Sequence, residues 1–162
     1  MMSLRKDHLT WLVVGLVVVT VAVAAYLVVL PYLQRQTTLH IGDGVFKAYI
    51  SDSAHIHQSE PKGMHELSEN KAVITVYPYD AAWEIDMRDR MTQFDVVWLN
   101  KDKKVVYIVK NASSASEPNA LFTPNEPARY IVELRGGTVE RKAVTINSVA
   151  AFDETEAEEV VR

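Results

Sequence analysis

The sequence of 162 residues contains no cysteine. The absence of thiols excludes disulfide bonds, thiolate metal sites, a cysteine nucleophile and a lipoprotein anchor, and it leaves the redox compartment open. A positive charge excess is missing as well, because 17 lysine and arginine residues stand against 21 aspartate and glutamate residues and give a net charge of −4. Such a chain lacks the basic footprint of nucleic-acid binding. We therefore expect no nucleic-acid partner.

The familiar motifs of catalysis and cofactor binding are also missing. The sequence has no glycine-rich phosphate loop, no nucleophile elbow and no His-Glu-x-x-His motif. His55 and His57 are two residues apart, and Glu60, His65 and Glu66 follow closely. Residues of these types bind metals, but nothing in their spacing fixes a coordination geometry. We interpret this segment as a solvated polar loop and expect neither a metal site nor a cofactor.

One long apolar run stands near the N-terminus. Residues 9–33 carry no charge, and at about 1.5 Å of rise per residue a helix of this length crosses a hydrocarbon core of about 30 Å. Trp11 lies near one end and Tyr26 and Tyr32 near the other, as interfacial aromatic residues often do. A cleaved signal peptide is the alternative, because Ala22 and Ala24 resemble a cleavage site. The apolar run continues beyond these alanines, which favours a retained anchor.

The charges that flank this run predict its orientation. Arg5, Lys6 and the amino terminus outweigh Arg35, so the N-terminus should be cytoplasmic and the rest of the chain extracytoplasmic. We expect a single-pass protein of the cell membrane, with the membrane as one partner. Its predicted parts are a cytoplasmic N-terminus (1–8), a transmembrane helix (9–33), a linker (34–44), a β-rich domain (45–150) and an acidic C-terminal tail (151–162).

Residues 87–110 predict a hairpin at the centre of the β-rich domain. Residues 94–99 are rich in β-branched and aromatic residues, residues 100–104 are polar and turn-forming, and residues 105–109 form a second β run. Alternation places Asp95, Val97 and Leu99 on one face of the first strand, and Phe94, Val96 and Trp98 on the other. Both faces are mostly apolar, so the strand should be covered on both sides. A buried Asp95 must then find hydrogen-bond donors or take up a proton.

Short strands separated by turn signals predict the rest of the domain. We expect mainly β structure, as a small jelly-roll-like sandwich or barrel with one or two short helices. Residues 111–127 form a long loop, a candidate lid. The expected strands are 45–51, 71–77 ending at Pro78, 82–87, 129–134 and 143–147. One helical turn is expected at 61–67, a short turn or helix at 138–142, and a frayed helix at 153–161.

Several segments in order resemble a known family. They are Leu67-Ser68-Glu69-Asn70 before a strand ending in Tyr77-Pro78, then Met87 through Asp95 to Asn100, then residues 127–134 with Gly137. Over residues 45–149 this order resembles domain-of-unknown-function family 192 (DUF192). The resemblance implies a small, mainly β, jelly-roll-like domain of unsettled function, in a family whose members often have an N-terminal signal or anchor. This chain departs from the pattern at Asp86, Asp89, Arg90 and Lys103, where many members have Trp, Asn, Thr and a turn Gly.

Five charged residues are the candidate ligand-binding residues: Asp95, Arg88, Arg90, Glu133 and Asp86. For Asp95 we favour a structural role, in which it accepts backbone N–H groups, over that of a general base or ligand-binding group. Arg88 and Arg90 either bind an anionic ligand or neutralise nearby aspartates, and we favour neutralisation. Glu133 is expected to pair with one of these arginines.

Three functions remain open from the sequence. The favoured one is a tethered extracytoplasmic binding or accessory module that recognises a small polar ligand, a glycan or an envelope partner. The alternative is a hydrolase-like enzyme that uses Asp95 and Glu133 as an acid/base pair. That alternative requires both carboxylates to face a common cleft. A purely structural subunit of an envelope complex is the third possibility.

Overall fold

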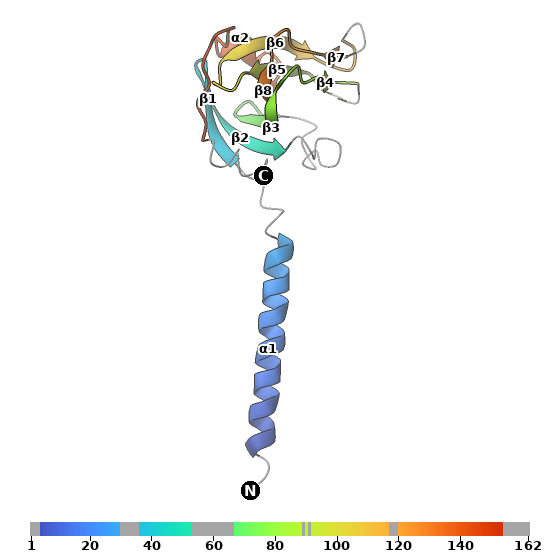
Figure 1. The fold of residues 1–162 in the computed structure, drawn as a ribbon, viewed down its shortest axis with the longest axis vertical. Coiled ribbons are helices and arrows are strands. Elements are labelled where there is room, and N and C mark those ends of the chain that lie inside the picture. The colour runs from blue at the N-terminus through green and yellow to red at the C-terminus, as the bar shows by residue number, and fades with distance from the viewer. Residues whose placement is uncertain are drawn as a thin grey trace. The chain divides into compact units, whose positions relative to one another are not determined.

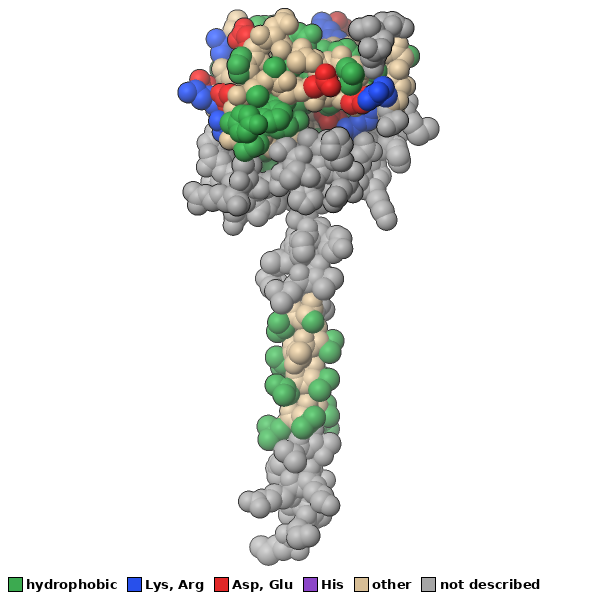
Figure 2. All heavy atoms as spheres, turned by 45° about the vertical axis from the view of Figure 1, so that its right-hand side comes forward, with side chains coloured by type: hydrophobic (Ala, Val, Ile, Leu, Met, Phe, Trp, Pro, Cys, Tyr) green, Lys and Arg blue, Asp and Glu red, His purple; other side chains and the backbone are tan. Residues whose placement is uncertain are grey.

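The computed structural model describes residues 4–29, 36–52, 67–88, 90, 92–116 and 120–153. The chain divides into two units, residues 1–34 and residues 35–162. Helix α1 spans Leu4–Val29 in the first unit. Its described side chains, at positions 11–24, are all exposed and mostly hydrophobic (Figure 2). Within the part of the chain that the structure describes, no helix is long and apolar enough to cross a membrane. The predicted transmembrane span therefore stays a prediction.

The second unit is built on one sheet of six strands in the order β1-β2-β3-β8-β5-β6 (Figure 1). Strands β2 and β3 pair in parallel, and the other neighbours pair antiparallel. Strands β4 and β7 form a separate two-stranded ladder. The bounds are β1 Gln36–Ile41, β2 Gly44–Asp52, β3 Lys71–Ala81, β4 Ile85–Asp86, β5 Phe94–Leu99, β6 Val105–Ala112, β7 Leu121–Phe122, β8 Ala128–Arg135 and helix α2 Thr138–Arg141.

The two edges of the sheet are connected by the chain that follows α2. His40 of β1 exchanges two backbone hydrogen bonds with Ala151, at 2.9 and 2.8 Å. Lys104 bridges to Val149 before β6, and the Val105 N–H donates to the carbonyl of Ser148 at 2.8 Å. The sheet therefore curls, with residues 147–152 spanning between its edges. The mainly β class is confirmed, but six of the described strands form one curled sheet, with the β4–β7 ladder apart from it, and they do not close into a barrel.

The curled sheet has a core on each side. The inner core lies on the concave side and includes Leu39, Phe46, Val97, Val132 and the Phe152 ring. The outer core lies on the other side of the middle strands and includes Val73, Tyr77, Val96, Trp98 and Ile131, among others. All six residues of β5 are buried. The prediction that this strand is covered on both faces, with Val96 and Trp98 opposite Val97 and Leu99, is therefore confirmed.

The turn between β5 and β6 also follows the prediction. The side-chain Oδ1 of Asn100 accepts hydrogen bonds from the backbone N–H groups of Asp102 and Lys104, both at 3.0 Å. Lys103 has a φ of 58°, in the left-handed region where glycine is favoured. The hairpin lies at one end of the sheet, however, and β3 and β8 occupy its middle.

Four strand predictions need correction. Strand β1 falls within the range expected as a linker, so the domain begins before residue 45. Strand β3 continues past Pro78, because the sheet register breaks there and needs no N–H from proline. The strand expected at 82–87 shortens to β4. The strand expected at 143–147 is absent from these described residues, because Ala143 and Asn147 have positive φ angles, which end an extended run.

The remaining predictions are met in part. Helix α2 forms within the range expected for it. The expected loop at 111–127 contains the end of β6 and strand β7. The helical turn expected at 61–67 and the frayed helix expected at 153–161 lie almost wholly outside the described residues.

Candidate functional site

The sheet separates the two carboxylates that the sequence suggested as an acid/base pair. In the register between β5 and β8, Asp95 pairs with Leu134, and the next residue, Val96, pairs with Glu133. Directly opposite residues share a face and successive residues alternate. Asp95 therefore lies on the inner face and Glu133 on the outer face. An enzyme that uses Asp95 and Glu133 together is excluded, because no common cleft can hold both.

Asp95 holds two backbone segments together. Its side chain is fully buried, with Oδ1 accepting the Asn111 N–H at 2.8 Å and Oδ2 accepting the Val139 N–H at 2.7 Å. Asn111 lies where β6 bulges against β5, and Val139 is in the first turn of α2. Gly137, the N-cap of α2, has no side chain to cap that turn. Asp95 thus takes the structural role favoured from the sequence.

Glu133 forms an ion pair with Arg90, as the sequence predicted. The distance between Arg90 Nη2 and each Glu133 carboxylate oxygen is 3.3 Å, and the side chains are 16% and 7% exposed. The Arg90 guanidinium also lies 5.3 Å from the centroid of the Phe94 ring. Burial, together with the nearby Glu133 carboxylate, raises the pKa of Tyr77 to about 12. This polar cluster is therefore enclosed within the outer core.

Arg88 and Asp86 form a separate ion pair at the surface. The Arg88 guanidinium donates to both carboxylate oxygens of Asp86, and the Arg88 backbone N–H donates to Oδ1 at 2.9 Å. These hydrogen bonds lower the pKa of Asp86 to about 2. The five predicted residues thus occupy three places: Asp95 on the inner face, Arg90 with Glu133 in the outer core, and Arg88 with Asp86 at the surface.

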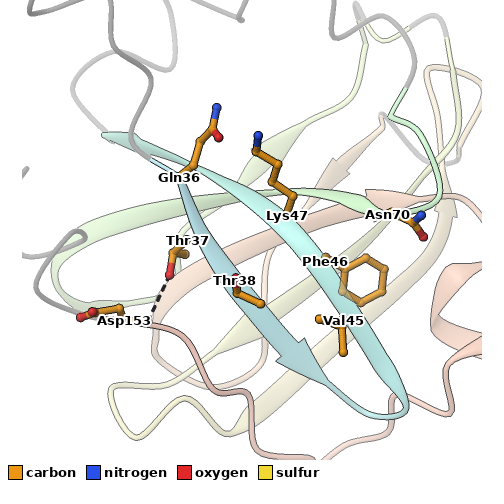
Figure 3. A pocket seen from close by; sticks show the side chains of 8 residues that line it. All are labelled: Gln36, Thr37, Thr38, Val45, Phe46, Lys47, Asn70 and Asp153. Atoms are coloured by element: carbon orange, nitrogen blue, oxygen red, sulfur yellow. Dashed lines mark hydrogen bonds between the residues drawn. The ribbon is translucent and has the colours of Figure 1, made fainter.

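A hollow lies elsewhere, at the β1–β2 hairpin (Figure 3). This groove has a volume of about 870 Å³. None of the five predicted residues is among the described residues that line it. Those lining residues are Gln36, Thr37 and Thr38 of β1, Val45, Phe46 and Lys47 of β2, Asn70 and Asp153.

Cross-strand pairing explains the polar character of the groove. Thr38 is the direct partner of Lys47, while the neighbouring pair, Leu39 and Phe46, is buried in the inner core. Gln36 and Lys47 point to the same side in Figure 3. The Asp153 backbone N–H donates to Thr37 Oγ1 at 3.3 Å. The groove therefore offers hydroxyl, amide, ammonium and carboxylate groups around one opening.

Lys47 has a second lysine beside it. In the parallel register of β2 and β3, Lys47 is the direct partner of Lys71, and both are exposed. Like charges at directly opposed positions of a sheet repel each other. An anion bound near Lys47 would relieve this repulsion.

A smaller hollow of about 360 Å³ lies beside α2, lined by Glu69, Asn70, Thr138, Arg141 and Lys142. Asn70 lines both hollows. Among the described residues there is no group of three or more His, Asp or Glu side chains that could hold a metal ion.

The groove residues were missed because residues 36–38 were assigned to a linker. The sequence contains a usable signal, since Thr38-Leu39-His40-Ile41 alternates polar and apolar residues and precedes Gly42-Asp43-Gly44. Alternation followed by a glycine-containing turn is typical of a hairpin.

These features define a class, namely a small, mainly β domain with an N-terminal helix, a polar groove, and Asp95 and Glu133 on opposite faces of its sheet. A profile of the DUF192 family, described as "Uncharacterized ACR", matches residues 40–152. The chain belongs to the DUF192 family. The resemblance seen in the sequence is thereby confirmed at the level of the family.

Solved structures share the fold. A protein from Sinorhizobium meliloti 1021 that was proposed to be a transcription regulator is 15% identical, with a TM-score of 0.65 over 74% of this chain and 95% of that one. A protein of unknown function from Novosphingobium aromaticivorans DSM 12444 is 18% identical, with a TM-score of 0.61 over 72% of this chain and 83% of that one. A comparison with curated proteins gives no match.

Proposed function

We propose that this DUF192 domain is a binding module for a small polar ligand with an anionic group, held in the groove at the β1–β2 hairpin. The observation that carries the proposal is the groove itself, where Lys47 stands among the hydrogen-bonding side chains of Gln36, Thr38 and Asn70. Sites for small ligands are concave and use a few converging polar groups to fix orientation. The proximity of Lys71 to Lys47 favours an anion at this point.

Binding is a better interpretation than catalysis, because the buried acids are already engaged. Asp95 accepts two backbone N–H groups on the inner face, and Glu133 is paired with Arg90 in the outer core. A general acid or base must reach the reacting group directly or through one water molecule. Neither carboxylate lines the groove.

A ligand screen on the full chain tests this proposal. The chain is purified in a detergent without a sugar headgroup and heated with phosphate, citrate, nucleotides or amino acids. A ligand at about 100 times its Kd stabilises the folded state by about 2.7 kcal/mol, which raises Tm by several degrees. We expect Lys47→Gln to abolish the shift and Lys101→Gln, which removes an exposed lysine in the β5–β6 turn, to keep it. No shift with any anion, or an unchanged shift in Lys47→Gln, would contradict the proposal.

We further propose that the apolar run at residues 9–33 tethers the domain to the cell membrane, with the N-terminus in the cytoplasm. Support comes from the uncharged, apolar sequence of residues 9–33 and from the exposed hydrophobic side chains along the described part of α1. The full chain should stay with membranes after carbonate extraction, and protease added to intact cells should cleave the domain. A mature protein that begins after Ala24 would instead indicate a cleaved signal peptide.

An envelope partner protein is a second candidate for what the module recognises. It would be favoured if a single protein co-purified with the full chain from solubilised membranes and Lys47→Gln released it. In that case the anionic group would belong to the partner.

A further inference from the structure

A second surface feature lies away from the groove, at the end of β3. Between the pairs Val76–Tyr130 and Ala81–Ala128, four residues of β3 face a single residue of β8. A bulge of this size pushes residues 77–80 out of the ladder and re-aims their side chains. The Tyr79 side chain is consequently 58% exposed, although it belongs to a strand.

Trp83 completes this feature and makes it rigid. Its ring stacks on Tyr77 at 4.3 Å between centroids and is tilted by 50° to the Tyr79 ring at 5.1 Å. The Trp83 indole N–H donates to the carbonyl of Tyr79 at 3.0 Å. The Trp83 carbonyl accepts the indole N–H of Trp98 at 2.9 Å. We call Tyr79 and Trp83, backed by the buried ring of Tyr77, the aromatic shelf.

Charged residues directly follow Tyr79 and Trp83 in the sequence. Asp80 follows Tyr79 and accepts a hydrogen bond from Arg129 Nε at 2.7 Å, with both side chains about 30% exposed. Glu84 follows Trp83, and its carboxylate accepts a hydrogen bond from the Thr123 hydroxyl at 3.2 Å. Aromatic rings and hydrogen-bonding side chains therefore occur together in this part of the chain.

We propose that the aromatic shelf binds a pyranose ring of a glycan chain, independently of the groove at the β1–β2 hairpin. A pyranose has a face of C–H groups that packs on an aromatic ring, and a rim of hydroxyl groups. Tyr and Trp supply large, rigid apolar surfaces. Asp80, Arg129 and Glu84 supply the acceptors and donors that the hydroxyl groups require.

Two other partners fit the aromatic shelf less well. Aromatic recognition of a proline-rich peptide commonly uses the indole N–H as a donor to the peptide, but the Trp83 N–H is already bound to Tyr79. Insertion into a lipid surface is disfavoured by Asp80 and Glu84, because the surface of an anionic membrane repels carboxylates. A neutral, hydroxyl-rich ligand avoids both conflicts.

Isothermal titration of the full chain with three oligosaccharides tests the proposal. The probes are cellohexaose, chitohexaose and α-1,6-mannohexaose, and the detergent carries no sugar headgroup. We expect at least one probe to bind. Tyr79→Ala should weaken that binding about tenfold or more, while Tyr79→Phe, which keeps the ring, should lose much less. Tyr79 is largely exposed, so Tyr79→Ala should unfold at nearly the wild-type temperature.

Two control variants distinguish binding at the aromatic shelf from binding in the groove at the β1–β2 hairpin. Tyr49→Ala removes a half-buried aromatic side chain from β2, and Lys47→Gln removes the ammonium from the groove. Both should bind the oligosaccharide as wild type does. The proposal is overturned if no probe binds at millimolar concentration, if Tyr79→Ala binds as tightly as wild type, or if Tyr79→Ala weakens binding only to a proline-rich peptide or to anionic vesicles.

Discussion

Asp95 shows how one buried carboxylate can accept backbone N–H groups that have no acceptor in the local structure. Helix α2 begins after Gly137, which offers no capping side chain, and β6 bulges at Asn111, where φ is 51°. Each of these irregular points leaves a backbone N–H that needs an acceptor. Both carboxylate oxygens of Asp95 are used for this purpose. The side chain therefore holds β5, β6 and α2 in one arrangement.

Replacing Asp95 by Asn should destabilise the domain by about 3 kcal/mol. The amide has a similar shape, but its NH₂ group would face one of the two backbone N–H donors. Urea unfolding of the full chain, followed by tryptophan fluorescence, measures the change, because two of the three tryptophans, Trp83 and Trp98, lie in the domain. Asp102→Asn, at an exposed position of the β5–β6 turn, is the matched control and should change stability by less than about 0.5 kcal/mol. A similarly small loss in Asp95→Asn would show that the carboxylate is dispensable.

The raised pKa of Tyr77 predicts that the domain loses stability at alkaline pH. Its pKa in the folded state is about 12, because burial and the Glu133 carboxylate oppose the phenolate, against an ordinary value of 10.0. Between pH 10 and pH 12 the unfolded chain releases the proton while the folded chain retains it, so stability decreases as pH rises. The full difference corresponds to about 3 kcal/mol at most. Urea unfolding should show a smaller alkaline loss in Tyr77→Phe than in wild type, and an equal loss would contradict this assignment.

The pairing of Arg90 with Glu133 could be predicted because an acid in an apolar strand needs a nearby cation. The separation of Asp95 from Glu133 could not. Which face each carboxylate occupies depends on the register between β5 and β8, and a shift of one residue would exchange the faces. That register is set by contacts between paired residues that lie more than thirty positions apart in the sequence.

Among the strands, those with the highest apolar content were the ones that the sequence predicted correctly. Strands β5 and β8 are rich in buried β-branched, aliphatic and aromatic residues and were found almost to the residue. Strand β1 has an alternating burial pattern over only six residues and was read as a linker. Strand β3 was ended too early at Pro78, because the large bulge that accommodates this proline has no local sequence signature.

The turn between β1 and β2 packs directly on the end of α2. Gly42 has a φ of 54°, and a Cβ at this position would lie 2.2 Å from the carbonyl oxygen of Lys142. The same carbonyl accepts the Asp43 N–H at 2.7 Å. The contact needs a glycine both for its backbone conformation and for its lack of a side chain.

Gly42→Ala should therefore destabilise the domain by at least about 2 kcal/mol, from backbone strain and from a clash with rigid main chain. Urea unfolding of the full chain measures the loss. Gly15→Ala in α1 is the control, because nothing lies within 4 Å of a Cβ built there. If Gly42→Ala were as stable as Gly15→Ala, the hairpin would not pack on α2 in this way.

At the scale of the whole second unit, the curled sheet depends on residues 147–152. The last two of these residues fall in the range predicted to be an acidic tail. The predicted boundary at residue 150 follows the acidic composition of what comes next. In the structure, Ala151 pairs with His40 of β1, and Phe152 is 8% exposed in the inner core. The Phe152 ring meets Tyr130 edge-on at 5.2 Å, and Lys103 Nζ lies 4.4 Å from its centroid. Residues 151 and 152 thus belong to the folded domain.

A chain that ends after residue 150 should therefore lose more stability than Phe152→Ala alone. The point variant removes a buried ring and should cost about 3 kcal/mol. The truncation also removes the Ala151 N–H and carbonyl that pair with His40, which leaves the edge of β1 without these partners. Val149→Ala, at a side chain 66% exposed between the same two edges, should change little. Urea unfolding of wild type and the three variants gives the order of their stabilities. A truncated chain as stable as wild type would place the end of the domain at residue 150. The bridge between the two sheet edges would then contribute nothing to the stability of the fold.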